Sequence, residues 1–252
     1  MILRISLIAV SSSTIITLFI LSSSSHEFKN LIPEINRTES LYSRPHTKIM
    51  EVLLNPDKFF SERKNIGFKF PVLIVAISAI IAAFSAHLST ETVIEMASKA
   101  LREQGLSQSQ IEIFKSFVYA SMVVGAFIAV FIGWVVLTAL LYLFSMIFRS
   151  RGKFTTLMKF VAFSYIPAIL VCPITLYLSY ESFVMRNVSA LPASTLFGIV
   201  ISLWQAVYWT FAVKNARELS LRNSAITSAI VLALFISAPL YSLLQPSLLE
   251  MP

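Results

Sequence analysis

The sequence predicts an all-α fold, a polytopic bundle of five transmembrane helices in an integral membrane protein, with an additional signal-like or anchor segment at the N-terminus. Residues 116–148 run for 33 positions without a charged side chain, and about 20 residues of helix cross the hydrocarbon core. The basic residues of 149–153 follow directly, which is typical of a cytoplasmic loop. Of the 252 residues, 56% are hydrophobic and 13% are charged, against about 25% charged in soluble domains.

The first fifty residues allow three interpretations. Residues 1–22 carry one charge, Arg4, before an apolar run that ends in serines, which is typical of a signal peptide. A retained anchor, which would add a sixth span, fits equally well, and so does translation from Met50, which would leave this segment outside the functional protein. Residues 23–50 are predicted to be a polar linker, and residues 51–252 are predicted to be the membrane domain.

A short helix is expected from Thr47 to Phe60, with a break near Asn55-Pro56. Its mixture of aromatic and basic residues suits a helix that lies along the inner membrane surface, or a solvated lead-in to the first span. The first span is predicted over residues 70–88, with Pro71 in its first turn, where a missing N–H costs little.

Residues 89–115 form the one long loop between predicted spans. Ser89 or Thr90 is expected to cap a surface helix that Gly105 ends. The sequence Ser107-Gln108-Ser109-Gln110 has a capping-box pattern, and the helix that it starts is expected to continue into the long second span. These two helices would form a hairpin on the outer surface.

The third span, predicted over residues 158–180, contains Pro167 and Pro173. Each proline removes a helical backbone bond and tends to kink the helix. In lipid the freed carbonyls need other partners, such as the hydroxyls of Ser164 and Thr175. We therefore expect a kinked helix that is packed inside the bundle.

The fourth and fifth spans are predicted over residues 193–213 and 225–244, and the cations between spans then divide unevenly. Thirteen fall on one side: Arg44, Lys48, Lys58, Arg63, Lys64, Lys69, Arg149, Arg151, Lys153, Lys159, Lys214, Arg217 and Arg222. Four fall on the other: Lys99, Arg102, Lys115 and Arg186. The positive-inside rule therefore predicts that the pre-span segment is cytoplasmic and that the C-terminus lies on the opposite side.

The spans offer few groups for chemistry. Apart from Lys159 at the cytoplasmic end of the third span they contain no charged residue, the three histidines are isolated in the sequence, and Cys172 lies in an apolar run. We therefore predict no enzyme activity, no cofactor and no metal site. The small residues of the first two spans are expected to pack the helices against one another: Ser78, Ala79, Ala82, Ala83, Gly125, Ala126, Ala129 and Gly133.

Several short patterns occur in an order that resembles the Yip family, membrane proteins named for interaction with Ypt/Rab GTPases. Their positions are Asn55 and Pro56 before the first span, Gly152 in the basic loop, Ser164, Tyr165 and Pro167 at the start of the third span, and Trp204 in the fourth. The resemblance, to prokaryotic-type members, implies a five-span helical domain with a cytoplasmic N-terminus. The chain lacks the Asp-Leu-Tyr-Gly-Pro segment of eukaryotic members, so the resemblance implies a fold more than an activity.

The leading functional hypothesis is a non-enzymatic scaffold or adaptor in membrane organisation or trafficking. Arg149, Arg151 and Lys153 would contact anionic headgroups of the lipid bilayer or a membrane or cytoplasmic protein partner, although these residues could instead only fix the topology. A homo-oligomer is allowed by the sequence, whereas nucleic acid is not expected, because the cations are spread over short loops between apolar runs. The alternative is a small-solute permease or channel lined by the kinked third span and Gln205.

Overall fold

The computed structural model of the chain describes residues 53–187 and 189–244, which form helices joined by short connections, with no strand among them. The predicted signal-like segment and polar linker lie outside these residues. Four of the helices are long and apolar enough to cross a membrane, and a bent pair of helices brings the number of candidate spans to five. The predicted all-α bundle is confirmed for this part of the chain.

The first complete helix, α3 (Pro56–Glu62), is short and docks on the bundle. The Oδ1 atom of Asn55 accepts a hydrogen bond from the Lys58 N–H at 3.2 Å. Pro56 occupies the first turn, where a backbone N–H would have no helical partner, so its missing N–H costs little. Asn55 interrupts the helical conformation, which agrees with the predicted break. Phe59 and Phe60 are buried in the protein core. Both expectations for this helix are therefore wrong, because its aromatic residues face the protein and not the membrane surface or solvent.

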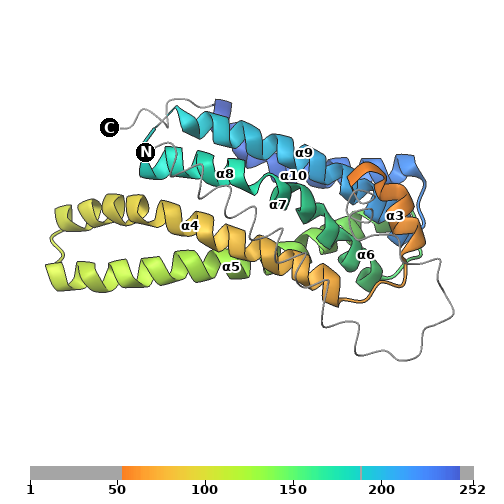
Figure 1. Ribbon diagram of the computed structural model, residues 1–252, viewed down its shortest axis with the longest axis horizontal. Helices are drawn as coiled ribbons and strands as arrows, with labels where there is room; N and C mark the ends of the chain where they lie inside the picture. Colours follow the sequence, from red (N-terminus) through yellow and green to blue (C-terminus); the bar gives the residue numbers. More distant parts are fainter. Residues whose placement is uncertain (1–52, 188, 245–252) are drawn as a thin grey trace, which may run out of the picture. The chain divides into compact units, whose positions relative to one another are not determined.

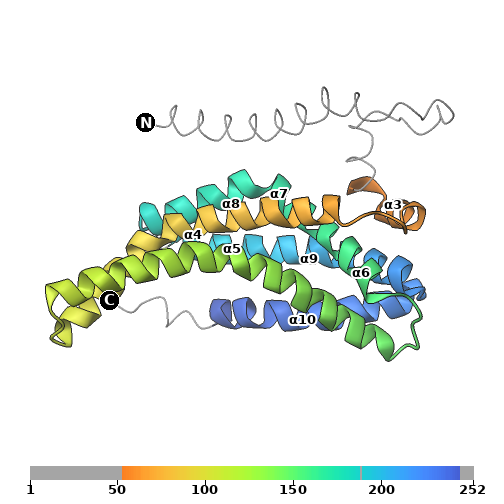
Figure 2. The same ribbon diagram turned by 90° about the horizontal axis from the view of Figure 1, so that it is seen from below.

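Two antiparallel helices, α4 (Lys69–Glu103) and α5 (Gln108–Met146), form the longest part of the fold. At 1.5 Å per residue they are about 52 and 58 Å long, well beyond the roughly 30 Å of a hydrocarbon core. Both extend past α8 and α9 as a hairpin (Figures 1 and 2). Gly105, at φ 81°, ends the turn, and Gln110 Oε1 accepts a hydrogen bond from the Ser107 N–H at 3.0 Å, as the capping-box prediction required.

The separate surface helix predicted to begin at Ser89 or Thr90 does not exist, because α4 continues through both residues. Their hydroxyls donate to the Ala86 carbonyl of the same helix, at 2.9 and 2.6 Å. A serine or threonine that bonds backward in this way stays inside a helix and caps nothing. The predicted hairpin is therefore present, but its first half is the end of the first span.

The third span is broken as its prolines predict. It contains α6 (Phe154–Val161), the 3-10 helix η2 (Ala162–Tyr165), α7 (Ile166–Leu170), α8 (Cys172–Ser179) and the π-helix η3 (Tyr180–Val184). The segments before and after Val171 are bent by 60°. Ser164 donates to the Val161 carbonyl at 2.8 Å and Thr175 donates to the Cys172 carbonyl at 2.9 Å. A proline removes the N–H that would bond the carbonyl four residues earlier, here those of Phe163 and Ile169. The expectation that these two hydroxyls bond the freed carbonyls is therefore wrong.

The last two helices are α9 (Ala190–Arg217) and α10 (Leu221–Leu244), which pack against each other. A left-handed Glu218, at φ 54°, ends α9. The α9 helix extends four residues past its predicted end, so Lys214 and Arg217 belong to the helix and not to a loop.

The packed core occupies one half of the bundle. It combines the first turns of α4 and α10 with the last turns of α5 and α9, together with α3, α6 and η2. A Cβ atom built on Gly125 or Gly133 would meet nothing within 4 Å. The expectation that these two glycines pack the spans together is therefore wrong, because they face away from the other described helices.

Candidate functional site at the basic end of the bundle

Most cations of the described chain lie at one end of the bundle, which we call the basic end. It consists of α3, residues 63–68, residues 147–153 and the junction between α9 and α10. These segments lie near one another at the end of the bundle where α3 is labelled in Figure 1. The Arg151 N–H donates to the Arg217 carbonyl at 3.4 Å, so the two most basic connections meet directly.

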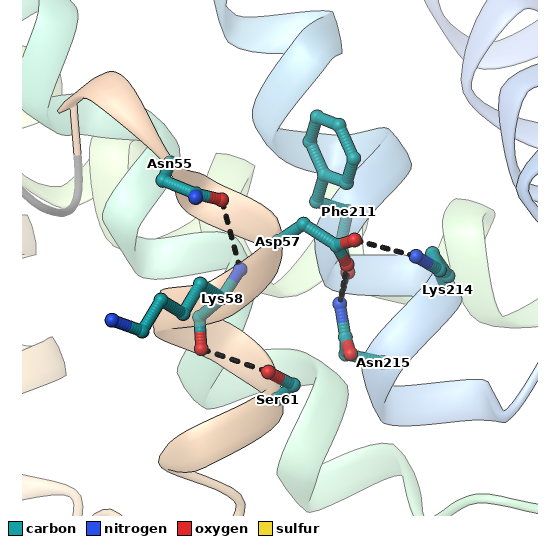
Figure 3. Close-up of polar contacts among 7 residues, drawn as sticks. All are labelled: Asn55, Asp57, Lys58, Ser61, Phe211, Lys214 and Asn215. Carbon is teal, nitrogen blue, oxygen red and sulfur yellow. Dashed lines mark hydrogen bonds and ion pairs between the residues drawn. The ribbon is translucent and has the colours of Figure 1, made fainter.

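An acid–base cluster fastens α3 to α9 (Figure 3). The Asp57 carboxylate accepts hydrogen bonds from Lys214 Nζ at 2.6 Å and from Asn215 Nδ2 at 2.9 Å. The same Asn215 amide donates to the Phe211 carbonyl at 3.0 Å, which orients it toward the carboxylate. The Lys214 bond, followed by that of Asn215, lowers the pKa of Asp57 below its ordinary value. Asp57 is therefore ionised at neutral pH and ties the two helices together.

An aromatic cluster also holds α3 against the bundle. The Phe59 ring meets Phe163 edge-on with centroids 4.9 Å apart, and the Phe60 ring lies 4.7 Å from Phe160. All four rings are buried. Since aromatic pairs of this geometry add to the benefit of burial, α3 is held by packing as well as by charge.

Arg217 is a buried cation, with 2% of its surface exposed. Its Nε donates to Ser145 Oγ at 3.0 Å, its Nη2 donates to Ser150 Oγ at 2.6 Å, and its guanidinium lies 4.0 Å from the centre of the Tyr142 ring. No carboxylate of the described residues pairs with it. Because α5 and α9 both end here, the negative ends of two helix dipoles offset the charge.

Gly152 lets the basic loop approach α9. A Cβ atom at this position would lie 1.6 Å from the Ala216 carbonyl oxygen, so only glycine fits without a shift of backbone. Exposure alternates along the loop: Ser150 and Gly152 are partly buried against the bundle, whereas Arg149, Arg151 and Lys153 are exposed. The three cations predicted to make contacts therefore point away from the bundle on a loop that is fixed from beneath.

The carboxylates of the basic end are already paired with lysines. Among the described residues of this end, Asp57 pairs with Lys214, Glu62 with Lys58 and Glu218 with Lys64, at 2.6, 3.9 and 3.8 Å. Within the same part of the chain, Arg149, Arg151 and Lys153 have no carboxylate partner. The basic end thus carries three exposed cations that no carboxylate of the described residues pairs with.

Comparison with known proteins fits this architecture. Residues 50–242 match the Yip1 domain. The chain belongs to the Yip1 family. A similar protein is an uncharacterised protein of Methanocaldococcus jannaschii, 29% identical over 143 residues that cover 56% of this chain and 92% of that protein. No solved structure matches the chain. The resemblance to the Yip family is confirmed, and this Yip1-family chain is an integral membrane protein whose helices contact lipid.

The motif residues of this Yip1-family protein have mostly architectural places. Asn55 and Pro56 begin α3, and Gly152 lies against α9. Ser164 and Pro167 are buried in the broken third span, with Tyr165 half-buried between them. Trp204, by contrast, is exposed on α9.

Asp57 and Arg217 belong to this site although no sequence pattern predicts them. Asp57 is part of the Asn-Pro motif, but its partners are more than 150 positions away in the chain, so no local pattern marks them. The sequence predicts Arg217 only as a loop cation, and the one local signal for its role is its position just beyond an apolar run. No group of three acidic, histidine or cysteine side chains that could hold a metal ion occurs among residues 53–187 and 189–244.

Proposed function

We propose that this protein is a non-enzymatic membrane scaffold or adaptor that holds anionic partners at its basic end. One observation carries the proposal: Arg149, Arg151 and Lys153 are exposed on a loop that Gly152 and Arg217 fix against α9. A rigid row of cations loses little conformational freedom on binding, which favours association. Paired surface cations would contribute less, since an internal carboxylate already satisfies them.

The positive-inside rule indicates which side of the membrane the basic end faces. Lys153 and Lys214 lie on the side that carries thirteen cations in the charge count, against four on the other side. We therefore propose that the basic end faces the cytoplasm and that α10 ends on the opposite side. The partner is then a cytoplasmic acidic surface or the inner leaflet, whose anionic lipids attract basic segments near the membrane.

The test neutralises the three cations together as R149Q/R151Q/K153Q in the full chain. Crosslinking in native membranes followed by isolation of the protein should recover fewer partners from the variant than from the unaltered protein. Reporter fusions at Lys153 must first show unchanged topology. The matched control is K99Q/R102Q, which removes exposed cations from the opposite end. If the triple variant keeps its full set of partners, the proposed contact is wrong.

A small-solute permease or channel is the second candidate. The 60° break in the third span at Val171 favours it, because discontinuous helices form the substrate sites of many transporters. Gln205 supports it as well, since this half-buried amide makes no hydrogen bond to the described residues. Reconstituted vesicles should then leak small polar solutes faster than empty vesicles, and Gln205→Leu should reduce the leak. Equal leakage from protein-containing and empty vesicles would exclude this candidate.

A further inference from the structure

The last turn of α5 presents apolar side chains right up to the basic loop. Leu143, Met146 and Ile147 are 58%, 54% and 69% exposed. They are spaced at i, i+3 and i+4, so they share one face of the helix. Arg149 follows two positions after Ile147, so an exposed apolar face adjoins exposed cations.

This arrangement favours one kind of anionic partner over another. A soluble acidic protein would bring charge to the loop but would gain little from aliphatic side chains on a membrane helix. A lipid molecule carries both features, with acyl chains for the apolar face and a phosphate for the cations. Basic groups at the membrane–water boundary of a helical bundle are suited to such headgroups.

The loop geometry suits an anionic headgroup. Its exposed residues alternate with residues that face the bundle, so Arg151 and Lys153 lie on the same side of the chain. Ser150 and Gly152 hold the segment in place from the other side, through Arg217 and Ala216. The cations are thus presented in a fixed row and do not have to be ordered by the ligand.

We propose that the apolar end of α5 and the basic loop form a binding site for an anionic phospholipid. Its phosphate lies against Arg149, Arg151 and Lys153, and its acyl chains lie along Leu143, Met146 and Ile147. This proposal rests on the proposed function, because it names the anion that the basic end holds. A protein partner would then meet a surface made of this protein and its bound lipid together.

The experiment measures which lipid stays on the protein. The full chain is reconstituted in nanodiscs of phosphatidylcholine with a minority of phosphatidylglycerol, released into mild detergent, and analysed by native mass spectrometry. We expect selective retention of phosphatidylglycerol. In R151Q/K153Q this selectivity should fall about fivefold for each cation removed. The double variant K99Q/R102Q, which loses the same two residue types at the other end of the bundle, should retain the lipid like the unaltered protein.

Two further variants guard against a folding artefact. R151K/K153R keeps both charges and should keep the selectivity, whereas the single change R151Q should lose about fivefold of it. Equal retention by all variants, or equal loss in R151Q/K153Q and K99Q/R102Q, would overturn the lipid site.

A parallel capture of a soluble polyglutamate peptide separates this proposal from the proposed function. If R151Q/K153Q loses the peptide but keeps phosphatidylglycerol, the lipid site is wrong and the scaffold proposal stands. If the variant loses neither ligand, both proposals are wrong.

Discussion

The two ends of the helical bundle are built in different ways, although α4 and α5 run through both. At the basic end, α4 buries Ile74 and Val75, and α5 buries Trp134, Leu137 and Leu141. Toward the other end, the same helices bury three residues, Thr90, Ser98 and Ile111. One end is therefore a packed interior, and the other end is a hairpin that is mostly surface.

The opposite end is held by separate polar contacts. Thr92 donates to the Phe183 carbonyl at 2.7 Å, Glu95 forms an ion pair with Arg186, and Tyr119 bonds His87 at 3.2 Å. Contacts of this kind contribute little each when they are exposed, and regions with few buried contacts open first. Lipid gives no hydrophobic drive for helices to associate. The stability of this fold therefore depends on the close packing of the basic end.

Phe60→Ala should have the largest effect, because it removes a fully buried ring from the basic end. We expect a loss of about 3–5 kcal/mol in the free energy of unfolding, measured by SDS titration in mixed micelles. Phe117→Ala is the control, since Phe117 lies on the hairpin half of α5 and is 71% exposed. It should cost less than about 0.5 kcal/mol. Similar losses for the two variants would remove the contrast between the ends.

Gly152→Ala should rank second and be compared with Gly125→Ala. At Gly152 the added methyl would strike the Ala216 carbonyl oxygen, which belongs to the backbone and cannot rotate away. We expect a cost of about 3 kcal/mol and faster hydrogen exchange in residues 149–153. At Gly125 the methyl meets open space, and alanine is the better helix former by about 0.5–1 kcal/mol. Opposite signs in the two melting-temperature shifts are the expected result, and shifts of the same sign would contradict it.

Local sequence patterns predicted the features whose causes are local. The apolar runs predicted the spans, Pro167 and Pro173 predicted the break in the third span, and Gly105 predicted the end of α4. The capping box at Ser107 also formed as its pattern requires. Each of these depends on a few neighbouring residues, so the chain itself contains the necessary information.

Features that depend on a distant partner could not be predicted. Gly125 and Gly152 are both single glycines in the sequence, yet only the position of α9 makes one of them crowded. Ser89 resembles a helix cap, but the helix continues because its hydroxyl bonds backward to Ala86. Arg217 resembles any loop cation until the end of α5 places Ser145 beside it. For the same reason no local pattern predicts the ion pair of Glu95 with Arg186, which lies 91 positions further along the chain.

Arg217→Lys should have an intermediate effect and tests the polar part of the basic end. Lysine keeps the charge but lacks the planar fork that reaches two hydroxyls and stacks on Tyr142. We expect a loss of about 2 kcal/mol, because one hydrogen bond to a charged group is removed inside the protein. Arg222→Lys, at an exposed position on α10, should leave the SDS midpoint within experimental scatter. If the two variants behave alike, Arg217 is not a structural part of the core.

Asp57→Asn should have the smallest effect on the free energy of unfolding. It tests whether the stability of the basic end depends on pH. The hydrogen bonds from Lys214 and Asn215 lower the pKa of Asp57 in the folded protein below its ordinary value of 3.8. The folded state therefore holds the proton less tightly than the unfolded state. The stabilisation is complete above that ordinary value and is lost as the pH falls through the lower, folded value. Because the pair is partly exposed, at 31% and 38% for the two side chains, we expect no more than about 1 kcal/mol at neutral pH.

The measurement is the SDS midpoint of each protein from pH 7 down to the acid limit of the micelles. The unaltered protein should lose stability in the most acidic part of this range, whereas Asp57→Asn should start lower and follow a flatter curve. Glu91→Gln removes an exposed carboxylate from α4 at the opposite end and should reproduce the unaltered curve. An unchanged acid limb in Asp57→Asn would mean that the rings of Phe59 and Phe60 hold α3 without help from the carboxylate.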